Sequence, residues 1–119
     1  MGKRILIVDD SPLILAAARH ALSVAGYEVE TRNGVEEVGA SGANGFDLIL
    51  MDVQMPELYG DDVARVLRND RGVRTPIYLF STLPPEELSA RAEDAKVDGF
   101  ISKNVGVEHL VDEVRKIIG

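Results

Sequence analysis

Short apolar runs alternate with amphipathic stretches along the chain, and this pattern predicts its elements. Residues 5–8 form an apolar run rich in β-branched side chains that stops at a pair of aspartates, as a buried parallel strand does. Further strands are predicted at 27–31, 47–52, 76–81 and 99–103. Charged side chains alternate along 27–31, so this strand is expected at an exposed edge of the sheet.

Amphipathic stretches with helical spacing of their apolar residues follow the strands. Ser11 and Pro12 are the expected N-cap and first residue of the first helix, and Gly26 is its expected end. Glycine is frequent after the second strand, so only a short, weakly specified helix is expected around 35–38. Later helices are predicted from residue 61, from residue 84 and over 107–118.

Repetition of these β–α units predicts an α/β fold in a single domain over residues 1–119. The sheet is expected to be five-stranded, parallel and doubly wound, because short connections between alternating strands and helices place helices on both faces. The expected architecture is a flavodoxin-like (βα)5 three-layer sandwich.

Composition narrows the classes of function. The 119 residues contain no cysteine, which excludes a thiol nucleophile, a Cys-ligated zinc and an iron–sulfur cluster. With 13 Lys and Arg against 20 Asp and Glu, the formal net charge of -7 disfavours direct contact with a nucleic-acid backbone. No apolar run approaches the roughly 18 residues of a membrane span, and no secretory signal is recognisable, so a cytoplasmic location away from the membrane is expected.

Chemically active side chains follow the predicted strands at the points where they end. The first strand ends in Asp9 and Asp10, the third in Asp52, the fourth in Ser81 and the last in Lys103. In an open α/β sheet the ligand site lies beyond the carboxyl ends of the strands, so these groups are expected to converge. Clustered carboxylates repel one another unless a cation offsets their charge, and a few oxygen ligands suit Mg²⁺. Lysine could also pair with a carboxylate or with a phosphoryl oxygen.

These residues belong to a pattern that resembles the receiver domain of two-component response regulators, of the stand-alone, chemotaxis-regulator-like kind. The resemblance covers essentially the whole chain. Its matching segments, in chain order, are 5–8 before Asp9-Asp10, 48–56 around Asp52, Gly60, Ser81, and 99–103 ending in Lys103. Each motif alone is weak, whereas all of them in this order and on these elements are specific. The resemblance implies the strand order 2-1-3-4-5, with strands numbered along the chain.

The resemblance also implies a site and a reaction. Asp52 would be the phosphoacceptor for a kinase histidine, in a reaction that needs Mg²⁺, for which Mn²⁺ can substitute. Asp10, Asp52 and the main-chain carbonyl of Gln54 would hold the ion, and Asp9 would act through water. The chain would not be an enzyme beyond self-catalysed phosphotransfer and autodephosphorylation. Aspartyl phosphate formation is a recognised form of nucleophilic catalysis by a carboxylate.

Implied switch residues and partners complete this expectation. Ser81 and Lys103 would contact the phosphoryl oxygens, and Phe100 would turn inward when the hydroxyl of Ser81 shifts. The implied partners are a sensor histidine kinase or phosphotransfer protein, and a downstream protein bound at the face of the fourth helix, fifth strand and fifth helix. A homodimer on that face is also expected. If residues 1–119 are the whole protein, they leave no space for an output module, and contact with a partner would deliver the output; a receiver domain cut from a longer chain would have the same sequence pattern.

The sequence departs from the family pattern at two positions near the site. Asn104 follows Lys103 where a proline is usual, so a trans bond and a somewhat different loop are expected. Thr82 stands where a smaller residue is preferred, which is expected to narrow access to Asp52. Gln54 and Leu83 flank the crevice and are expected to tune the phosphate lifetime.

His20 and His109 lack neighbouring metal ligands in the sequence and are expected as solvated surface histidines rather than as phosphohistidines or ligands.

Three other functions compete with the switch. A phosphohydrolase of the haloacid dehalogenase kind uses Asp-x-Asp after its first strand, whereas here Asp52 follows the third strand and Gln54 replaces the second acid. A flavodoxin-like FMN carrier is disfavoured because Asp9 and Asp10 would repel the phosphate. A non-phosphorylated pseudo-receiver acting as a protein-binding module stays open because of Thr82 and Asn104.

Overall fold

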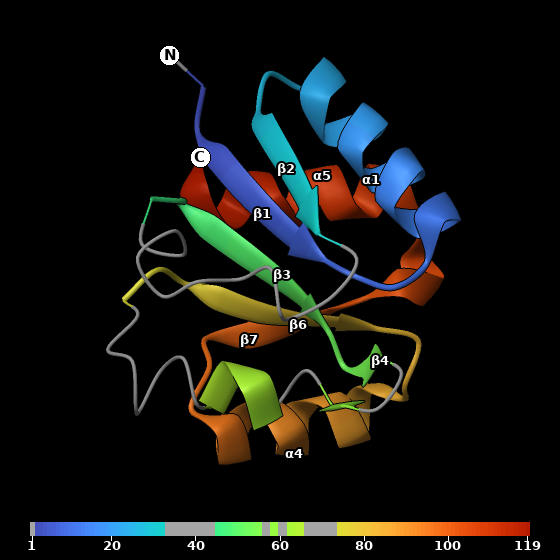
Figure 1. The fold of residues 1–119 in the computed structure, drawn as a ribbon, viewed down its shortest axis with the longest axis vertical. Coiled ribbons are helices and arrows are strands. Elements are labelled where there is room, and N and C mark those ends of the chain that lie inside the picture. The colour runs from blue at the N-terminus through green and yellow to red at the C-terminus, as the bar shows by residue number, and fades with distance from the viewer. Residues whose placement is uncertain (1, 33–44, 56–57, 60–61, 66–73) are drawn as a thin grey trace.

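Five parallel strands form the central sheet of the computed structural model, which describes residues 2–32, 45–55, 58–59, 62–65 and 74–119 (Figure 1). The strands are β1 (Arg4–Val8), β2 (Glu28–Arg32), β3 (Leu48–Asp52), β6 (Ile77–Ser81) and β7 (Gly99–Ser102). Their order across the sheet is β2-β1-β3-β6-β7. The predicted order 2-1-3-4-5 is confirmed, and the charged strand β2 lies at an edge as expected.

The helices lie on both faces of this sheet. They are α1 (Pro12–Val24), α4 (Pro85–Ala95) and α5 (Val107–Ile118), with a 3₁₀ turn η2 (Lys103–Val105) before α5, and residues 62–65 are also helical. In Figure 1, α1 and α5 lie against one face of the sheet, and α4 with the 62–65 segment against the other. The helix expected around 35–38 lies outside the described residues.

An apolar core lies on each face of the sheet, between the strands and the helices. Because side chains alternate along each strand, they contribute in turn to one core and to the other. In β1, Ile5 and Ile7 pack with Ala18 and Leu22 of α1, whereas Leu6 and Val8 face the α4 side. The same alternation runs along β3, all of whose residues are buried. A strand that is buried on both sides must be apolar throughout, and this explains the continuous apolar runs of the sequence.

The first helix begins and ends as its sequence predicts. Ser11 is the N-cap, and its Oγ accepts a hydrogen bond from the backbone N–H of Ile14 at 3.4 Å. Pro12 is the first helical residue, where its missing N–H costs nothing. Gly26 follows the last turn with a φ of 104°, a conformation that glycine adopts without strain.

A small antiparallel pair of strands follows β3 and was not expected from the sequence. It consists of β4 (Gln54–Met55) and β5 (Leu58–Tyr59), with Gln54 opposite Tyr59. Two-residue strands carry too few alternating positions to stand out in a hydrophobic pattern.

None of the helices in the described part of the chain is long and apolar enough to span a membrane.

Candidate functional site

Strand register brings the predicted site residues to one edge of the sheet. Val8 pairs with Met51, so Asp9 and Asp52, each one residue further along, are neighbours. Asp52 in turn pairs with Phe80 across the β3–β6 boundary. Ser81 pairs with Ser102, which places Lys103 just beyond the end of β7. The convergence that the sequence predicted at this edge is therefore present.

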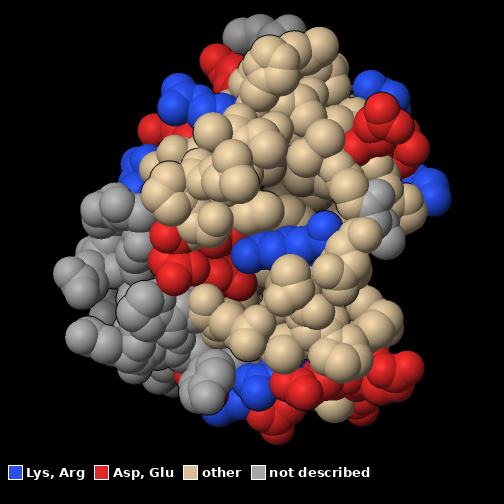
Figure 2. Space-filling model, turned by 90° about the vertical axis from the view of Figure 1, so that its right-hand side faces the viewer, with Lys and Arg blue, Asp and Glu red and all other residues tan. Residues whose placement is uncertain are grey.

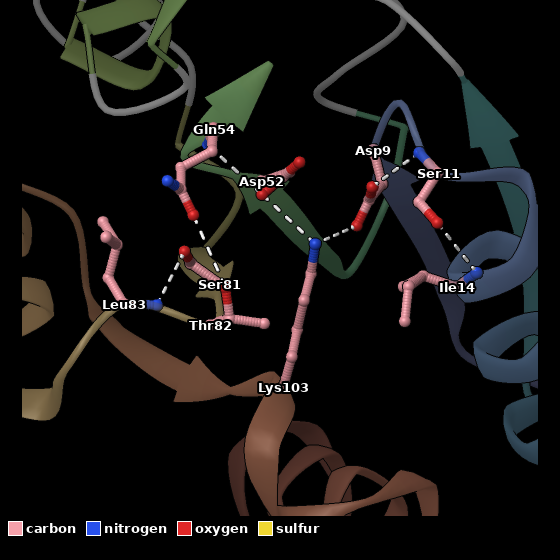
Figure 3. Close-up of polar contacts among 9 residues, drawn as sticks. All are labelled: Asp9, Ser11, Ile14, Asp52, Gln54, Ser81, Thr82, Leu83 and Lys103. Atoms are coloured by element: carbon pink, nitrogen blue, oxygen red, sulfur yellow. Dashed lines mark hydrogen bonds and ion pairs between the residues drawn. The ribbon is translucent and has the colours of Figure 1, made fainter.

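Lys103 connects the two buried carboxylates of this edge. Its Nζ lies 2.6 Å from Oδ2 of Asp9 and 3.2 Å from Oδ1 of Asp52 (Figure 3). The side chain of Lys103 is 9% exposed, that of Asp52 3% and that of Asp9 fully buried. Ionised groups this deeply buried are stable only when paired, so one ammonium offsets the repulsion between two carboxylates. Figure 2 shows acidic side chains directly beside a basic one at the centre of this face.

The ring of Phe80 supports the Lys103 side chain, a role that the sequence analysis did not identify. Because β6 lies between β7 and β3, Lys103 must cross the end of β6 to reach the carboxylates. Its Nζ lies 5.3 Å from the centroid of the Phe80 ring, within the range of a cation–π contact. Side chains alternate between the two faces of the sheet along a strand, and Phe80 directly precedes Ser81. The alternation along β6 therefore indicated that the Phe80 ring lies on the face opposite Ser81, which is the side of α1 and α5.

Asp52 is held in an environment that disfavours its charge. Burial and the neighbouring carboxylate of Asp9 raise the pKa of Asp52 to about 7, although the ammonium of Lys103 opposes this shift. The backbone N–H of Gln54 donates to Oδ1 of Asp52 at 3.2 Å and also favours the ionised form. A carboxylate with a pKa near neutrality exchanges its proton readily when a cation or a reactant arrives.

Three carboxylates of this edge can hold a divalent cation. One carboxylate oxygen each from Asp9, Asp10 and Asp52 lies within 4.8 Å of the others. Among the described residues no hydrogen bond ends on Oδ2 of buried Asp9, whose contact is the ion pair with Lys103. Oδ1 of Asp9 accepts a hydrogen bond from the N–H of Ser11 at 2.9 Å, which fixes the carboxylate. An acidic, oxygen-rich set of carboxylates fits the preference of Mg²⁺.

Ser81 and the loop after it form the opposite wall of the site. Ser81 is fully buried, and its Oγ accepts a hydrogen bond from the N–H of Leu83 at 3.2 Å. The proton of the Ser81 hydroxyl therefore remains suited to donation toward an oxygen placed in the crevice.

Thr82, in the loop after β6, forms hydrogen bonds with the segments that follow β3 and β7. Its Oγ1 donates to Oε1 of Gln54 at 3.4 Å, and its backbone carbonyl accepts from Nδ2 of Asn104 at 3.2 Å. In Figure 3 the side-chain amide of Gln54 reaches toward Thr82. We call these three residues the polar clasp. It could not be found from the sequence, because each hydrogen bond joins a different pair of strand-end loops.

Three further features singled out in the sequence also lie in the described part of the chain: the bond before Asn104, the ring of Phe100 and the two histidines. The peptide bond before Asn104 is trans, as expected where proline is replaced, and the loop forms the 3₁₀ turn η2. Phe100 is half-buried and packs against the core on the α4 side of the sheet. His20 and His109 are exposed, as predicted, and Nε2 of His109 lies 3.3 Å from a carboxylate oxygen of Glu113.

Known proteins share both the sequence pattern and the fold. A family model described as the response regulator receiver domain matches residues 5–115. The polar-differentiation response regulator DivK of Brucella anthropi is 30% identical over 121 residues, which cover 100% of this chain and 98% of that protein.

Solved structures agree with this match. The chemotaxis protein CheY4 of Vibrio cholerae is 29% identical with a TM-score of 0.84, over 98% of this chain and 99% of that one. A CheY-like receiver domain protein of Methanospirillum hungatei is 28% identical with a TM-score of 0.82, over 98% and 93% of the two chains. Receiver domains are signalling domains rather than conventional enzymes. This chain belongs to the response regulator receiver domain family.

Proposed function

We propose that the chain is a phosphorylation-dependent signalling switch whose phosphoacceptor is Asp52. The observation that carries this proposal is the 3.2 Å separation of Lys103 Nζ and Asp52 Oδ1 within a cluster of three carboxylates. A nucleophilic carboxylate needs a neighbouring cation to stabilise the charge that reaches it with the phosphoryl group. Membership of the receiver domain family supports the same assignment.

The phosphodonor in this proposal is a phosphohistidine of a sensor histidine kinase or phosphotransfer protein. A carboxylate oxygen of Asp52 attacks the phosphorus, an O–P bond forms as the N–P bond breaks, and the leaving imidazole nitrogen takes up a proton. The attacking carboxyl must be ionised, and a pKa of about 7 leaves a substantial ionised fraction at neutral pH. Hydrolysis of the acyl phosphate returns the carboxylate, so autodephosphorylation is the only other reaction proposed.

Mg²⁺ is the proposed cofactor, and Mn²⁺ a substitute. Asp10, Asp52 and the main-chain carbonyl of Gln54 would hold the ion, with Asp9 acting through water. When bound, the ion neutralises charge on the phosphoryl oxygens. Lys103 is already paired with Asp9 and Asp52, so it would be released toward the phosphoryl group once those carboxylates have another cation.

Ser81, Lys103 and Phe100 are the proposed switch residues. A phosphoryl group on Asp52 adds oxygens that the Ser81 hydroxyl and the Lys103 ammonium can bind. Ser81 would then give up its contact with the N–H of Leu83 and shift the loop that leads into α4. Phe100 lies on β7, beside α4, and would turn inward as this loop moves. The proposed output surface is the face of α4, β7 and α5.

Residues 1–119 would form one receiver domain that acts in the cytoplasm by contact with a downstream protein. Its polar clasp is proposed to slow access of the phosphodonor, because Thr82 and Gln54 meet across the crevice that leads to Asp52. Gln54 and Leu83 would set the phosphate lifetime.

Acetyl phosphate with Mg²⁺ tests the proposal directly. Intact-mass spectra of the wild-type chain should gain the mass of one phosphoryl group, and Asp52→Asn should gain none. Asp112→Asn, which removes an exposed carboxylate of α5, is the matched control and should be modified like the wild type. Omission of Mg²⁺ should abolish the adduct in the wild type and in Asp112→Asn.

Failure of the wild type to gain the adduct, both with acetyl phosphate and with a phosphorylated histidine kinase, would contradict the switch. The pseudo-receiver, a protein-binding module that is never phosphorylated, would then be the function that the fold supports.

A further inference from the structure

The ring of Phe80 lies between the lysine and the phosphoacceptor of the proposed reaction. Phe80 of β6 pairs with Asp52 of β3 on one side and with Ile101 of β7 on the other. Residues paired in this way across parallel strands point their side chains to the same face of the sheet. Phe80 and Ile101 belong to the core on the side of α1 and α5, so Asp52 points to this side as well. Lys103, two residues beyond Ile101, therefore passes the Phe80 ring on its way to Asp52.

The ammonium of Lys103 contacts this ring and the carboxylates at the same time. Its Nζ lies 5.3 Å from the centroid of the Phe80 ring, over the ring, and 3.2 Å from Oδ1 of Asp52. In Figure 3 the side chain of Lys103 extends from the end of β7 toward Asp52 and Asp9. Phe80 is 4% exposed and the side chain of Lys103 9%, and a cation–π contact strengthens when both groups are shielded from water. The ring therefore stabilises the inward orientation of the ammonium without drawing it away from the carboxylates.

A cavity of about 210 Å³ adjoins both Lys103 and Phe80. Its lining also includes Ala17 and Ala18 of α1 and Leu110 of α5. The stem of Lys103 therefore has space on this side, and packing of the core does not by itself fix its direction. A lysine side chain loses much rotamer freedom when it is held in one orientation, so an attractive contact is needed to offset this loss. The face of the Phe80 ring supplies such a contact.

The proposed phosphorylation of Asp52 needs the ammonium at this place. Phosphoryl transfer depends mainly on positioning and on neutralisation of the charge of the phosphoryl oxygens. A phosphoryl group on Asp52 would bring its oxygens to the side of the sheet on which the Lys103 ammonium already lies. An ammonium that spent part of its time in the adjoining cavity or in solvent would be absent when the charge arrives.

We propose that Phe80 is a positioning residue for the phosphorylation of Asp52, because its ring holds the Lys103 ammonium where the phosphoryl oxygens arrive. This role rests on the proposed function of Asp52. An aliphatic side chain of similar size would pack against the stem of Lys103 but would not attract its charge. The aromatic face of residue 80, and not only its volume, therefore contributes to the rate of phosphorylation.

Fluorination of the Phe80 ring separates its charge distribution from its size. Site-specific replacement of Phe80 by mono-, di- and trifluorinated phenylalanine weakens the negative face of the ring step by step and changes its shape little. With acetyl phosphate and Mg²⁺, the rate at which the intact mass gains one phosphoryl group should fall along the series, to about one third of the wild-type rate for the trifluorinated ring. Far-UV circular dichroism should stay the same throughout.

Phe46 offers a matched control. The guanidinium carbon of Arg4 lies 4.6 Å from the centroid of the Phe46 ring, so the same fluorinated series weakens a contact of the same kind. Arg4 begins β1 and Phe46 precedes β3, whereas Asp52 ends β3, so this contact lies at the opposite edge of the sheet. Fluorination of Phe46 should leave the phosphorylation rate unchanged.

Phe80→Leu removes the ring and keeps a buried apolar side chain. This variant should be phosphorylated about fivefold more slowly than the wild type. NMR of the unphosphorylated, metal-free wild type should place the ε-methylene protons of Lys103 upfield of those of Lys116, which is 73% exposed, because protons over an aromatic face are shielded. This upfield displacement should disappear in Phe80→Leu. If Phe80→Leu does not fold, the fluorinated series still decides the question.

Equal phosphorylation rates along the Phe80 series, in a wild type that accepts phosphate, would overturn the role of Phe80 and leave the phosphorylation of Asp52 intact. The same slowing by fluorination of Phe46 and of Phe80 would also overturn it. A wild type that never gains the phosphoryl group would overturn the proposed function and this role together, and that result is distinct because it is seen without any variant.

Discussion

The ammonium of Lys103 pairs with the fully buried carboxylate of Asp9, with 2.6 Å between Nζ and Oδ2. Asp9 and Lys103 end strands that are not adjacent, because both β3 and β6 lie between β1 and β7. The lysine therefore extends across the carboxyl edge of the sheet and passes the ring of Phe80. Without another cation, this single ammonium balances the charges that burial brings together in Asp9 and Asp52.

Lys103→Met removes that balance while it keeps the apolar stem of the side chain. In metal-free buffer at pH 8 we expect the free energy of unfolding to fall by about 3 kcal/mol, because two carboxylates lose their buried partner. The loss should shrink as the pH is lowered and Asp52 takes up a proton. Urea denaturation measures the change. Lys116→Met, at a side chain that is 73% exposed, should stay within about 0.5 kcal/mol of the wild type.

Asp52→Asn should stabilise the metal-free protein at alkaline pH. The pKa of Asp52 is raised from 3.8 to about 7, so between these pH values the folded state binds more protons than the unfolded state. The wild type therefore loses stability as the pH rises through this window. The gain from the variant should be small near pH 4 and reach at most about 4 kcal/mol above pH 7. Thermal denaturation against pH measures it. A gain that is equal at pH 4 and pH 8 would contradict a raised pKa.

Magnesium binding should depend on the carboxylate cluster and should release protons. Asp9→Asn and Asp10→Asn should each weaken Mg²⁺ affinity at least tenfold, measured as the shift of thermal midpoint with Mg²⁺ concentration. Asp112→Asn should bind like the wild type. Because the ion favours ionised Asp52, calorimetry near pH 6.5 in buffers of different ionisation enthalpy should show proton release in the wild type but not in Asp52→Asn.

The polar clasp should slow phosphorylation. Thr82→Val keeps the size of the side chain and removes the hydroxyl that donates to Gln54, whereas Thr82→Ala also opens the crevice. We expect both to accept phosphate from acetyl phosphate several-fold faster than the wild type, with Thr82→Ala the faster. Asn104→Ala, which frees the carbonyl of Thr82, should have a smaller effect of the same sign. Rates equal to the wild type in Thr82→Val would show that the size of Thr82 and not its hydrogen bond limits access.

Gly99 at the start of β7 should accommodate even a methyl side chain poorly. A Cβ at this position would lie 2.8 Å from Cε2 of the Tyr78 ring on the neighbouring strand. Gly99→Ala should therefore cost about 1–3 kcal/mol in the free energy of unfolding, because the half-buried ring must shift from its packed position. A double-mutant cycle measures the contact: Gly99→Ala should lower the free energy of unfolding by less in the Tyr78→Ala background than in the wild type.

Much of this architecture follows from local patterns in the chain. The continuous apolar runs around Ile7 and Leu50, each stopped by an aspartate, identified buried parallel strands and their ends. Ser11, Pro12 and Gly26 marked the limits of α1 because capping and left-handed conformations depend on the residue itself. The resemblance to receiver domains then supplied the strand order, which local patterns do not contain.

Contacts within the site depended on the tertiary structure. Lys103 was expected to meet a carboxylate or a phosphoryl oxygen, but only the positions of β1, β3 and β7 decided that it pairs with both Asp9 and Asp52. The hairpin of β4 and β5 and the hydrogen bond from Asn104 to Thr82 were not predicted. Each of these contacts joins separate segments, and its energy depends on register and distance rather than on the local chain.

The sequence by itself determined the order of the elements, the strand-end positions of the acids and the lysine, and the exposure of both histidines, since these depend on periodicity and residue type. Tertiary structure decided which of those charges neutralise one another and that the Phe80 ring supports Lys103. The physical reason is that burial and pairing are properties of neighbours in space. Asp52 acquires its raised pKa only where the fold removes water and places Asp9 beside it.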